Sequence, residues 1–292
     1  MLAKAVIKNS SLGVIFTLVF SLLASVHVFA AAKSAATSKV LFSVRPLAIL
    51  YVELTGLAVR EEQVLVAAGK NLHDYHLSLS EIKRLNETST VFWMGAENEV
   101  MLNDLSQEVR KGKWYAVASK PHQWLSWQDQ IAFIQGYSQT LQAILPARQS
   151  LIVAHEKALL TKLNASFTLW QQQVEKNKMK PILMAHEAFA PWVTDLSMPQ
   201  PVYYSSGHSH GKAAQGGKQS LKIQQQIMKN EISCALEEPD AHFDQLEKKF
   251  PTLNTVLLEP MADSQSLMKG EWAAFWQYNW RQLSACMQLS QS

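Results

Sequence analysis

The sequence predicts an α/β protein with two lobes, each built on a mainly parallel four-stranded sheet flanked by helices, and joined by one long rigid helix. Three observations support this prediction. Short apolar runs recur along the chain of 292 residues, and helical patterns separate them. The runs are continuously apolar, as expected of strands buried on both faces of a parallel sheet. They also fall into two sets of four, with one uninterrupted helical pattern between the sets.

The expected strands can be placed in chain order. They cover residues 39–44, 63–67, 90–94 and 114–118 in the first set, and 181–185, 202–205, 232–236 and 255–258 in the second. Between them, Ser78 and Ser126 are each followed three residues later by an acidic residue, as in a capping box. Residues 147–177 contain no proline or glycine and carry apolar residues at helical spacing, which predicts a stiff connection. We therefore expect an N-terminal lobe over residues 31–146, a linking helix over 147–178 and a C-terminal lobe over 179–292.

The first 30 residues have the pattern of a secretory signal peptide. Lys4 and Lys8 precede an apolar stretch over residues 12–24, and small residues surround a cleavage position after Ala30. The apolar stretch is short for a membrane anchor, because a spanning helix needs about 20 residues. We expect export of the chain and cleavage near Ala30.

Composition and cysteine content narrow the function classes. Hydrophobic residues make up 48% of the chain, which excludes a largely disordered protein. The formal net charge of +3 is too small for a surface that recruits nucleic acid or anionic lipid. Cys234 and Cys286 are the two cysteines, and in an exported protein such an isolated pair is most simply one structural disulfide.

Three histidines stand where expected strands end or just after them, namely His73, His122 and His186. Glu259 ends the last expected strand. Ligands bind at the carboxyl ends of the strands in open α/β sheets, and three imidazoles with one carboxylate suit a zinc-like ion. A single histidine at such a position is more often a core or loop residue than a ligand, so the pattern alone leaves both interpretations open.

Six short runs surround these residues. In chain order they read GKNLHDYHLSLS over 69–80, TVFWMG over 90–95, KPHQWL over 120–125, HEAF over 186–189, CALEEP over 234–239 and LEPM over 258–261. Together they resemble the periplasmic zinc-binding proteins that feed ABC importers, the ZnuA family within the zinc and manganese solute-binding proteins. The resemblance implies a periplasmic binding protein, not an enzyme, that captures Zn²⁺ and delivers it to an inner-membrane ABC permease. We also expect a monomer and no nucleic-acid partner.

Carried over position by position, the resemblance makes His73, His122 and His186 the imidazole ligands of the metal. Glu259 stands where the family has an aspartate on the opposite lobe, so either Glu259 or water is expected as the fourth ligand. Lys120 replaces a family aspartate that could orient a ligating histidine. A histidine at position 186 favours zinc over a harder ion such as manganese. Cys286 lies where the zinc proteins carry their second half-cystine.

Several accessory residues and alternatives stay open. His208 and His210 lie in a glycine-rich loop over residues 205–217 and either collect ions or are incidental, whereas His76 is an accessory ligand at best. A manganese or iron carrier of the same fold is the first alternative function. A secreted zinc hydrolase is the second, but neither His155 nor His186 begins the H-E-x-x-H motif of such enzymes.

Overall fold

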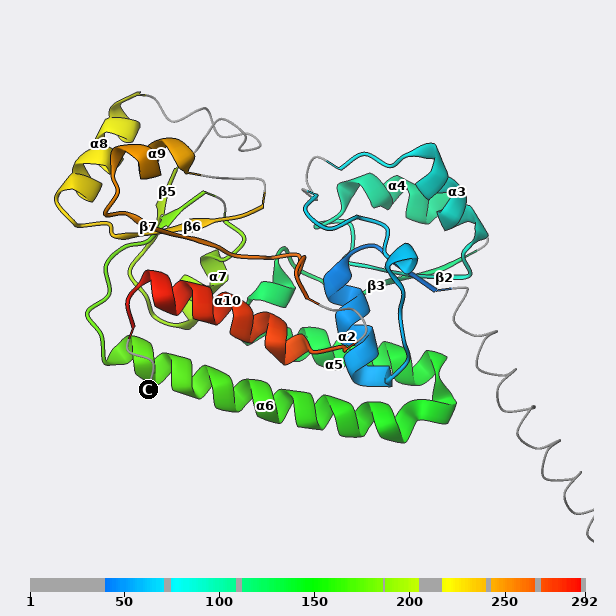
Figure 1. Ribbon diagram of the computed structural model, residues 1–292. Helices are drawn as coiled ribbons and strands as arrows, with labels where there is room; N and C mark the ends of the chain where they lie inside the picture. The colour runs from blue at the N-terminus through cyan, green and yellow to red at the C-terminus, as the bar shows by residue number, and fades with distance from the viewer. Residues whose placement is uncertain are drawn as a thin grey trace, which may run out of the picture. The chain divides into compact units, whose positions relative to one another are not determined.

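Two sheets organise the chain (Figure 1). Among the described residues, the N-terminal sheet has the strand order β1-β2-β3 and the C-terminal sheet the order β5-β4-β6-β7. β2 pairs in parallel with β3, and the pairs within the C-terminal sheet are parallel as well. The strands are β1 (Val40–Phe42), β2 (Thr90–Trp93), β3 (Lys113–Ala116), β4 (Leu183–Met184), β5 (Val202–Tyr203), β6 (Cys234–Glu237) and β7 (Asn254–Leu257). The predicted α/β fold class is thereby confirmed.

This computed structural model describes residues 40–70, 75–108, 112–185, 187–204, 217–239, 243–265 and 269–289. The described residues from Leu41 onward form one compact unit. The expected signal peptide, residues 1–30, lies outside the described residues. No helix in the described ranges is long and apolar enough to cross a membrane.

One expected strand is reduced to an isolated bridge. Residues 63–67 were expected to add a fourth strand to the N-terminal sheet, but Glu61–Gln63 form the short 3₁₀ helix η2. The backbone N–H of Arg60 donates to the Gln63 side chain at 3.1 Å, which closes this turn. Beyond it, Val64 makes only an isolated parallel bridge to Phe42. The Leu65 and Val66 N–H groups also donate to the Phe42 and Ser43 carbonyl oxygens, at 2.8 and 2.9 Å, so this segment lies beside β1 without forming a full strand.

Helices flank both sheets. They are α2 (Arg45–Thr55), α3 (Leu79–Glu87), α4 (Val100–Glu108), α5 (Trp127–Ile144), α6 (Gln149–Glu175), α7 (Ala190–Asp195), α8 (Gly217–Met228), α9 (Asp244–Lys249) and α10 (Trp272–Cys286), with short 3₁₀ turns η3 (Gln123–Leu125) and η4 (Pro146–Arg148). The predicted capping box at the start of α3 is present, with Ser78 accepting from the Glu81 N–H and Glu81 accepting from the Ser78 N–H. Ser126 likewise accepts from the Asp129 N–H at the start of α5.

The long helix α6 has one buried stripe along its 27 residues. Its buried side chains are Ile152, Leu159, Leu163, Phe167, Trp170 and Val174. They recur at the three- and four-residue spacing that keeps them on one face of a helix. This face packs against α2 and α5 and also against α10, so α6 connects elements from both ends of the chain (Figure 1).

Aromatic rings fill the junction around α6. Trp170 of α6 stacks on Trp280 of α10 with ring centroids 5.0 Å apart. Trp192 of α7 stacks on Trp276 of α10 at 5.1 Å. Trp127, the first residue of α5, stacks on Phe167 of α6 at 4.1 Å. Such pairs add to the free energy gained by burying their surface, so the helices dock through these rings.

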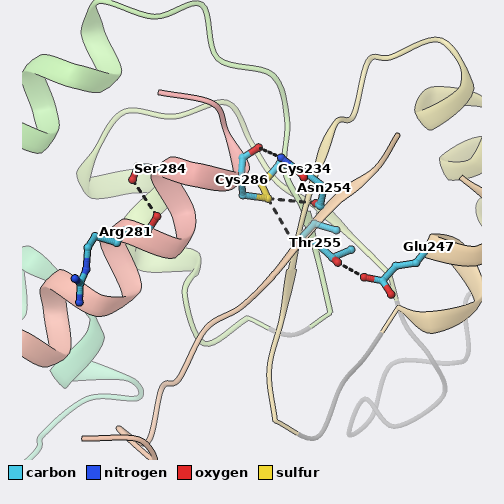
Figure 2. Close-up of a disulfide and its surroundings, with 8 residues drawn as sticks. Cys234, Glu247, Asn254, Thr255, Arg281, Ser284 and Cys286 are labelled. Carbon is cyan, nitrogen blue, oxygen red and sulfur yellow. Dashed lines mark hydrogen bonds between the residues drawn. A yellow bond between two sulfur atoms is a disulfide. The ribbon is translucent and has the colours of Figure 1, made fainter. Parts of the chain in front are cut away.

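The predicted disulfide joins the C-terminal sheet to the last helix (Figure 2). Cys234 begins β6 and Cys286 ends α10, with their Cα atoms 5.3 Å apart. The Asn254 amide of β7 also donates to the Cys286 carbonyl oxygen at 3.3 Å. In a chain-entropy view, the covalent link removes freedom mainly from the unfolded chain. It therefore fastens the end of α10 to the start of β6, beside the start of β7.

Candidate metal site

His122 lies in the loop between β3 and α5, in a left-handed backbone conformation with φ 51°. Its backbone N–H donates to the Asn98 side-chain oxygen at 3.1 Å. The Asn98 amide in turn donates to the Lys120 and Met94 carbonyl oxygens, at 3.2 and 3.1 Å. Asn98 therefore ties the turn that follows β2 to the turn that follows β3, and both strands belong to the N-terminal sheet.

A buried carboxyl group lies beside Asn98. Glu99 is fully buried and accepts a hydrogen bond of 2.7 Å from the Met94 N–H. Burial raises the pKa of Glu99 to about 7, although the Met94 N–H favours the charged form. Glu99 thus helps to fix the turn after β2, from which the Asn98 side chain reaches the His122 loop.

Trp124 connects the His122 loop to the Glu259 loop, which we define as residues 259–265. The Trp124 ring meets the His122 ring edge to face, with centroids 5.7 Å apart. Its indole N–H donates to the Pro260 carbonyl oxygen at 2.9 Å, and the ring is buried. The structure therefore brings together the loops that carry two of the predicted ligands, His122 and Glu259.

Lys120 does not leave an unpaired charge beside His122. Its ammonium group forms an ion pair of 2.6 Å with Asp129 in the first turn of α5. Lys120, which replaces an aspartate of the family, is therefore paired with a carboxylate of α5.

Glu259 follows β7 and is only 6% exposed. Its carboxylate accepts hydrogen bonds from the Ser264 N–H and hydroxyl, at 2.9 and 2.7 Å. Its backbone N–H donates to the Asn279 side chain of α10 at 2.8 Å. Burial raises the pKa of Tyr278, and a hydrogen bond to Glu259 raises it further. The Glu259 carboxylate is therefore engaged by its own loop and by α10.

The remainder of the Glu259 loop is held from the N-terminal part of the chain. Arg45, at the start of α2, is 7% exposed. Its guanidinium donates to the Ala262 carbonyl oxygen at 3.2 Å and to the Gln265 carbonyl oxygen, and it pairs with Glu61 at 2.5 Å. Between these two carbonyl groups, the Asp263 carboxylate accepts a hydrogen bond from the Gly69 N–H. Burial raises the pKa of Asp263, the nearby Glu259 raises it further, and Gly69 and Arg45 oppose this rise.

The other predicted ligands lie outside the described residues. These are His73, His186, His208 and His210. His76 is described and exposed. Among the described residues, no three histidine, cysteine or acidic side chains gather closely enough to hold a metal ion. The complete ligand set accordingly stays a prediction.

Three residues of this region carried no signal in the sequence analysis. Asn98, Arg45 and Asp263 all act through partners that lie far from them in the chain, or through backbone atoms. The sequence shows that Arg45 precedes Pro46 and that Asp263 follows Glu259 by four residues. Neither pattern predicts which residue the side chain contacts.

Comparison with known proteins decides the family. The family model described as "ZnuA: Zinc-uptake complex component A periplasmic" matches residues 40–286. The chain belongs to this family. ZnuA-family proteins are substrate-binding proteins rather than enzymes, in agreement with the sequence prediction.

Two curated relatives are named as ZnuA proteins of high-affinity zinc uptake systems. The protein of Yersinia pestis is 31% identical over 101 residues, which are 35% of this chain and 31% of the relative. The protein of Haemophilus influenzae is 32% identical over 83 residues, which are 28% of this chain and 24% of the relative. The matched segment thus spans no more than about a third of either relative's length.

Solved structures share the ZnuA-like fold over nearly their whole length. A ZnuA deletion mutant with zinc bound has a TM-score of 0.70 at 16% identity, over 87% of this chain and 99% of that chain. The solute-binding protein FpvC of Pseudomonas aeruginosa, in complex with Mn²⁺, has a TM-score of 0.67 at 14% identity, over 86% of this chain and 98% of that chain. At these identities the likeness concerns the fold.

Proposed function

We propose that the chain captures Zn²⁺ in the periplasm and delivers it to an inner-membrane ABC permease, as a monomer. His73, His122 and His186 are the proposed imidazole ligands, and Glu259 or water takes the fourth position. The family match over residues 40–286 is the observation that carries this proposal. The hydrogen bond from Trp124 to Pro260 supports it, because it brings the His122 and Glu259 loops together.

The proposal includes the organisation of the chain. A signal peptide over residues 1–30 is removed near Ala30, lobes span residues 31–146 and 179–292, and residues 147–178 join them. The ion then binds between the lobes at the carboxyl ends of their strands. Since α6 packs along helices from both parts, binding involves small adjustments of loops rather than a wide closure.

Native mass spectrometry of the mature chain in a mixture of zinc, manganese and copper salts tests the proposal. We expect one tightly held zinc ion in the wild-type protein and none in the His73→Ala, His122→Ala, His186→Ala triple variant. His155→Ala is the matched control, because it removes an imidazole of α6 that is not among the predicted ligands. Zinc that is retained by the triple variant would overturn the proposed ligand set.

Manganese is the second candidate cargo. The FpvC structure contains Mn²⁺ on the same fold, and Glu259 offers a carboxylate, which hard ions prefer. Preferential loading of the wild-type protein with manganese in the same mixture would replace zinc with this alternative.

An imidazole cage also makes binding depend on pH, because a protonated histidine cannot ligate a metal. We expect zinc affinity to fall between pH 7.5 and pH 5.5 in competition titrations with a chelator. An unchanged affinity over this range would contradict ligation by histidines.

A further inference from the structure

A carboxylate from the C-terminal part of the chain lies at the start of α5, the helix that follows the His122 loop. Asp195 is the last residue of α7 and is 9% exposed. Its carboxylate accepts a hydrogen bond of 2.6 Å from the Trp127 N–H and one of 3.3 Å from the Ser126 hydroxyl. Trp127 begins α5, and Ser126 is the residue just before it. The contact therefore joins α7, which follows β4 of the C-terminal sheet, to the end of a loop that leaves the N-terminal sheet.

The start of α5 also has caps of its own. The Asp129 N–H donates to the Ser126 hydroxyl at 3.2 Å, and the Asp129 carboxylate supplies negative charge in the first turn, where a helix favours it. Asp195 adds a second carboxylate from 68 residues beyond Trp127. Burial raises the pKa of Asp195, and the Asp129 charge raises it too, against the hydrogen bonds from Trp127 and Ser126. Local capping alone therefore does not account for Asp195, whereas a connection between α5 and α7 does.

Aromatic rings continue this connection to α10. The Trp127 ring meets the Trp276 ring edge to face, with centroids 6.0 Å apart. Trp192, three residues before Asp195, stacks on the same Trp276 ring at 5.1 Å. The start of α5 and the body of α7 thus converge on one ring of α10, and the hydrogen bond from Trp127 to Asp195 joins them directly. Such close packing leaves the start of α5 little room to move relative to α10.

The same helix α10 holds the Glu259 loop. The Asn279 side chain, one turn after Trp276, accepts a hydrogen bond of 2.8 Å from the Glu259 N–H. Asn279 is fully buried, and its amide also donates to the Glu259 carbonyl oxygen at 3.4 Å. A series of contacts therefore runs from the end of the His122 loop through Trp127 and α10 to Glu259. A shift of the start of α5 would change the distance between the two loops.

We propose that Asp195 is a positioning residue for the metal site, whose carboxylate pins the end of the His122 loop to α7 and so sets its spacing from the Glu259 loop. This inference rests on the proposed function and deepens it. A ligand that is already in place when the ion arrives loses less conformational freedom on binding. Asp195 acts through the backbone of Trp127 and is not itself a ligand.

Four variants test the pin. Asp195→Ala removes the acceptor of the Trp127 N–H, whereas Asp195→Asn keeps a side-chain oxygen for it without the charge. Asp195→Ser has a shorter polar group and replaces the alanine variant if that one folds poorly. Ser126→Ala is the matched control, because it removes the side-chain cap of α5 but leaves the 2.6 Å hydrogen bond between α5 and α7.

Two measurements separate positioning from a general loss of stability. One is the rate of zinc release to an excess of chelator at a temperature where every variant is folded. The other is the visible absorption spectrum of the Co²⁺-loaded protein, which reports ligand number and geometry. A residue that only stabilises the start of α5 would lower the melting temperature and leave both readouts as in the wild type.

For Asp195→Ala and Asp195→Ser we expect about tenfold faster zinc release, the factor that corresponds to losing one hydrogen bond to a charged acceptor. We also expect a change in the Co²⁺ spectrum of these variants. Asp195→Asn and Ser126→Ala should release zinc at nearly the wild-type rate.

Three outcomes would overturn the pin. The first is release from Asp195→Ala that is no faster than release from Ser126→Ala, because the effect would then arise from the helix cap. The second is an unchanged Co²⁺ spectrum in Asp195→Ala. The third is equally fast release from Asp195→Asn, since that variant retains an acceptor for the Trp127 N–H.

His122→Ala separates this inference from the proposed function. If His122→Ala retains zinc with wild-type affinity, the proposed site is wrong. If His122→Ala loses zinc while Asp195→Ala matches the wild type, only the pin is wrong.

Discussion

The His122 loop and the Glu259 loop both follow a strand of a parallel sheet, but they are held in different ways. Asn98 holds the His122 loop from a neighbouring turn of the same sheet. Arg45, 217 residues before Ala262 in the chain, holds the Glu259 loop. One loop is thus built locally, and the other depends on docking between distant parts. Damage to the docking should therefore displace Glu259 more than His122.

The largest expected effect comes from Gly270, where the chain that leaves the Glu259 loop meets α2. A Cβ at this position would lie 2.5 Å from the Glu53 backbone nitrogen, and φ is +59°. Gly270→Ala therefore combines backbone strain with a clash that cannot be relieved by a side chain, and we expect a loss of about 4 kcal/mol in the free energy of unfolding. Urea denaturation measures it.

Gly56→Ala is the control for this substitution. Gly56 also has a positive φ, +65°, but the nearest atom to its Cβ would be 4.0 Å away. Strain alone should then cost about 1 kcal/mol. Equal losses in the two variants would show that the contact with α2 is not tight.

Arg45→Met should have the next largest effect. Methionine fills much of the same space but leaves the Ala262 and Gln265 carbonyl oxygens without their guanidinium donor. We expect a loss of about 3 kcal/mol, because buried polar groups without partners are costly. Hydrogen exchange should then show faster exchange of amides over residues 259–265 and little change over residues 119–125. Equal acceleration in both segments would contradict the difference between the loops.

Glu99 gives the corresponding prediction for the His122 loop. Burial raises the pKa of Glu99 to about 7, from 4.5 for an ordinary glutamate. Between these two pH values the unfolded chain ionises Glu99 while the folded protein keeps the proton, so stability falls as pH rises through this window and levels off above it. Glu99→Gln should remove this dependence. The variant should therefore gain about 3 kcal/mol of stability relative to the wild type on going from pH 4.5 to pH 8.

Thermal melts of the wild type and Glu99→Gln at both pH values measure the difference. The wild type should lose more stability than the variant as pH rises. Parallel changes in the two proteins would mean that Glu99 does not titrate in this window.

Trp124→Phe has the smallest expected effect and concerns the contact between the loops. Phenylalanine keeps a buried ring but has no N–H for the Pro260 carbonyl oxygen. We expect a loss of about 1 kcal/mol, the usual net value of one hydrogen bond. In a double-mutant cycle with Arg45→Met, the two losses should be less than additive, since both contacts position the same loop. Strict additivity would show that the contacts are independent.

The features that sequence reasoning recovered are governed by local or periodic chemistry. Ser78 and Glu81 form the predicted capping box because its partners are three residues apart. Spacing of three and four residues predicted α6, and the cysteine pair predicted its own disulfide. The expected strand at 63–67 is only an isolated bridge at Val64, although Leu65 and Val66 also bond to the backbone at Phe42 and Ser43. Apolar content alone does not predict how many residues of such a segment pair.

The candidate site was recovered only in part for a related reason. The His122 and Glu259 loops follow strands of different sheets. Their proximity was therefore implied by the family resemblance rather than by the position of strand ends, and the bond from Trp124 to Pro260 brings the two loops together. The engagement of Glu259 by Ser264 depends on how a loop turns, which residue identity does not specify. The bond from Arg45 to Ala262 joins residues 217 positions apart, and no pattern in a single sequence reports a contact at that separation.

The stacked tryptophans have an optical consequence. Trp170, Trp192, Trp276 and Trp280 come from three helices and lie with neighbouring centroids as close as 5.0 Å. Indole transitions at this separation couple electronically and produce circular-dichroism bands that isolated indoles lack. Because α6, α7 and α10 each contribute rings, those bands persist only while the three helices stay docked. Near-ultraviolet circular dichroism of the unlabelled protein should therefore report whether these three helices are docked.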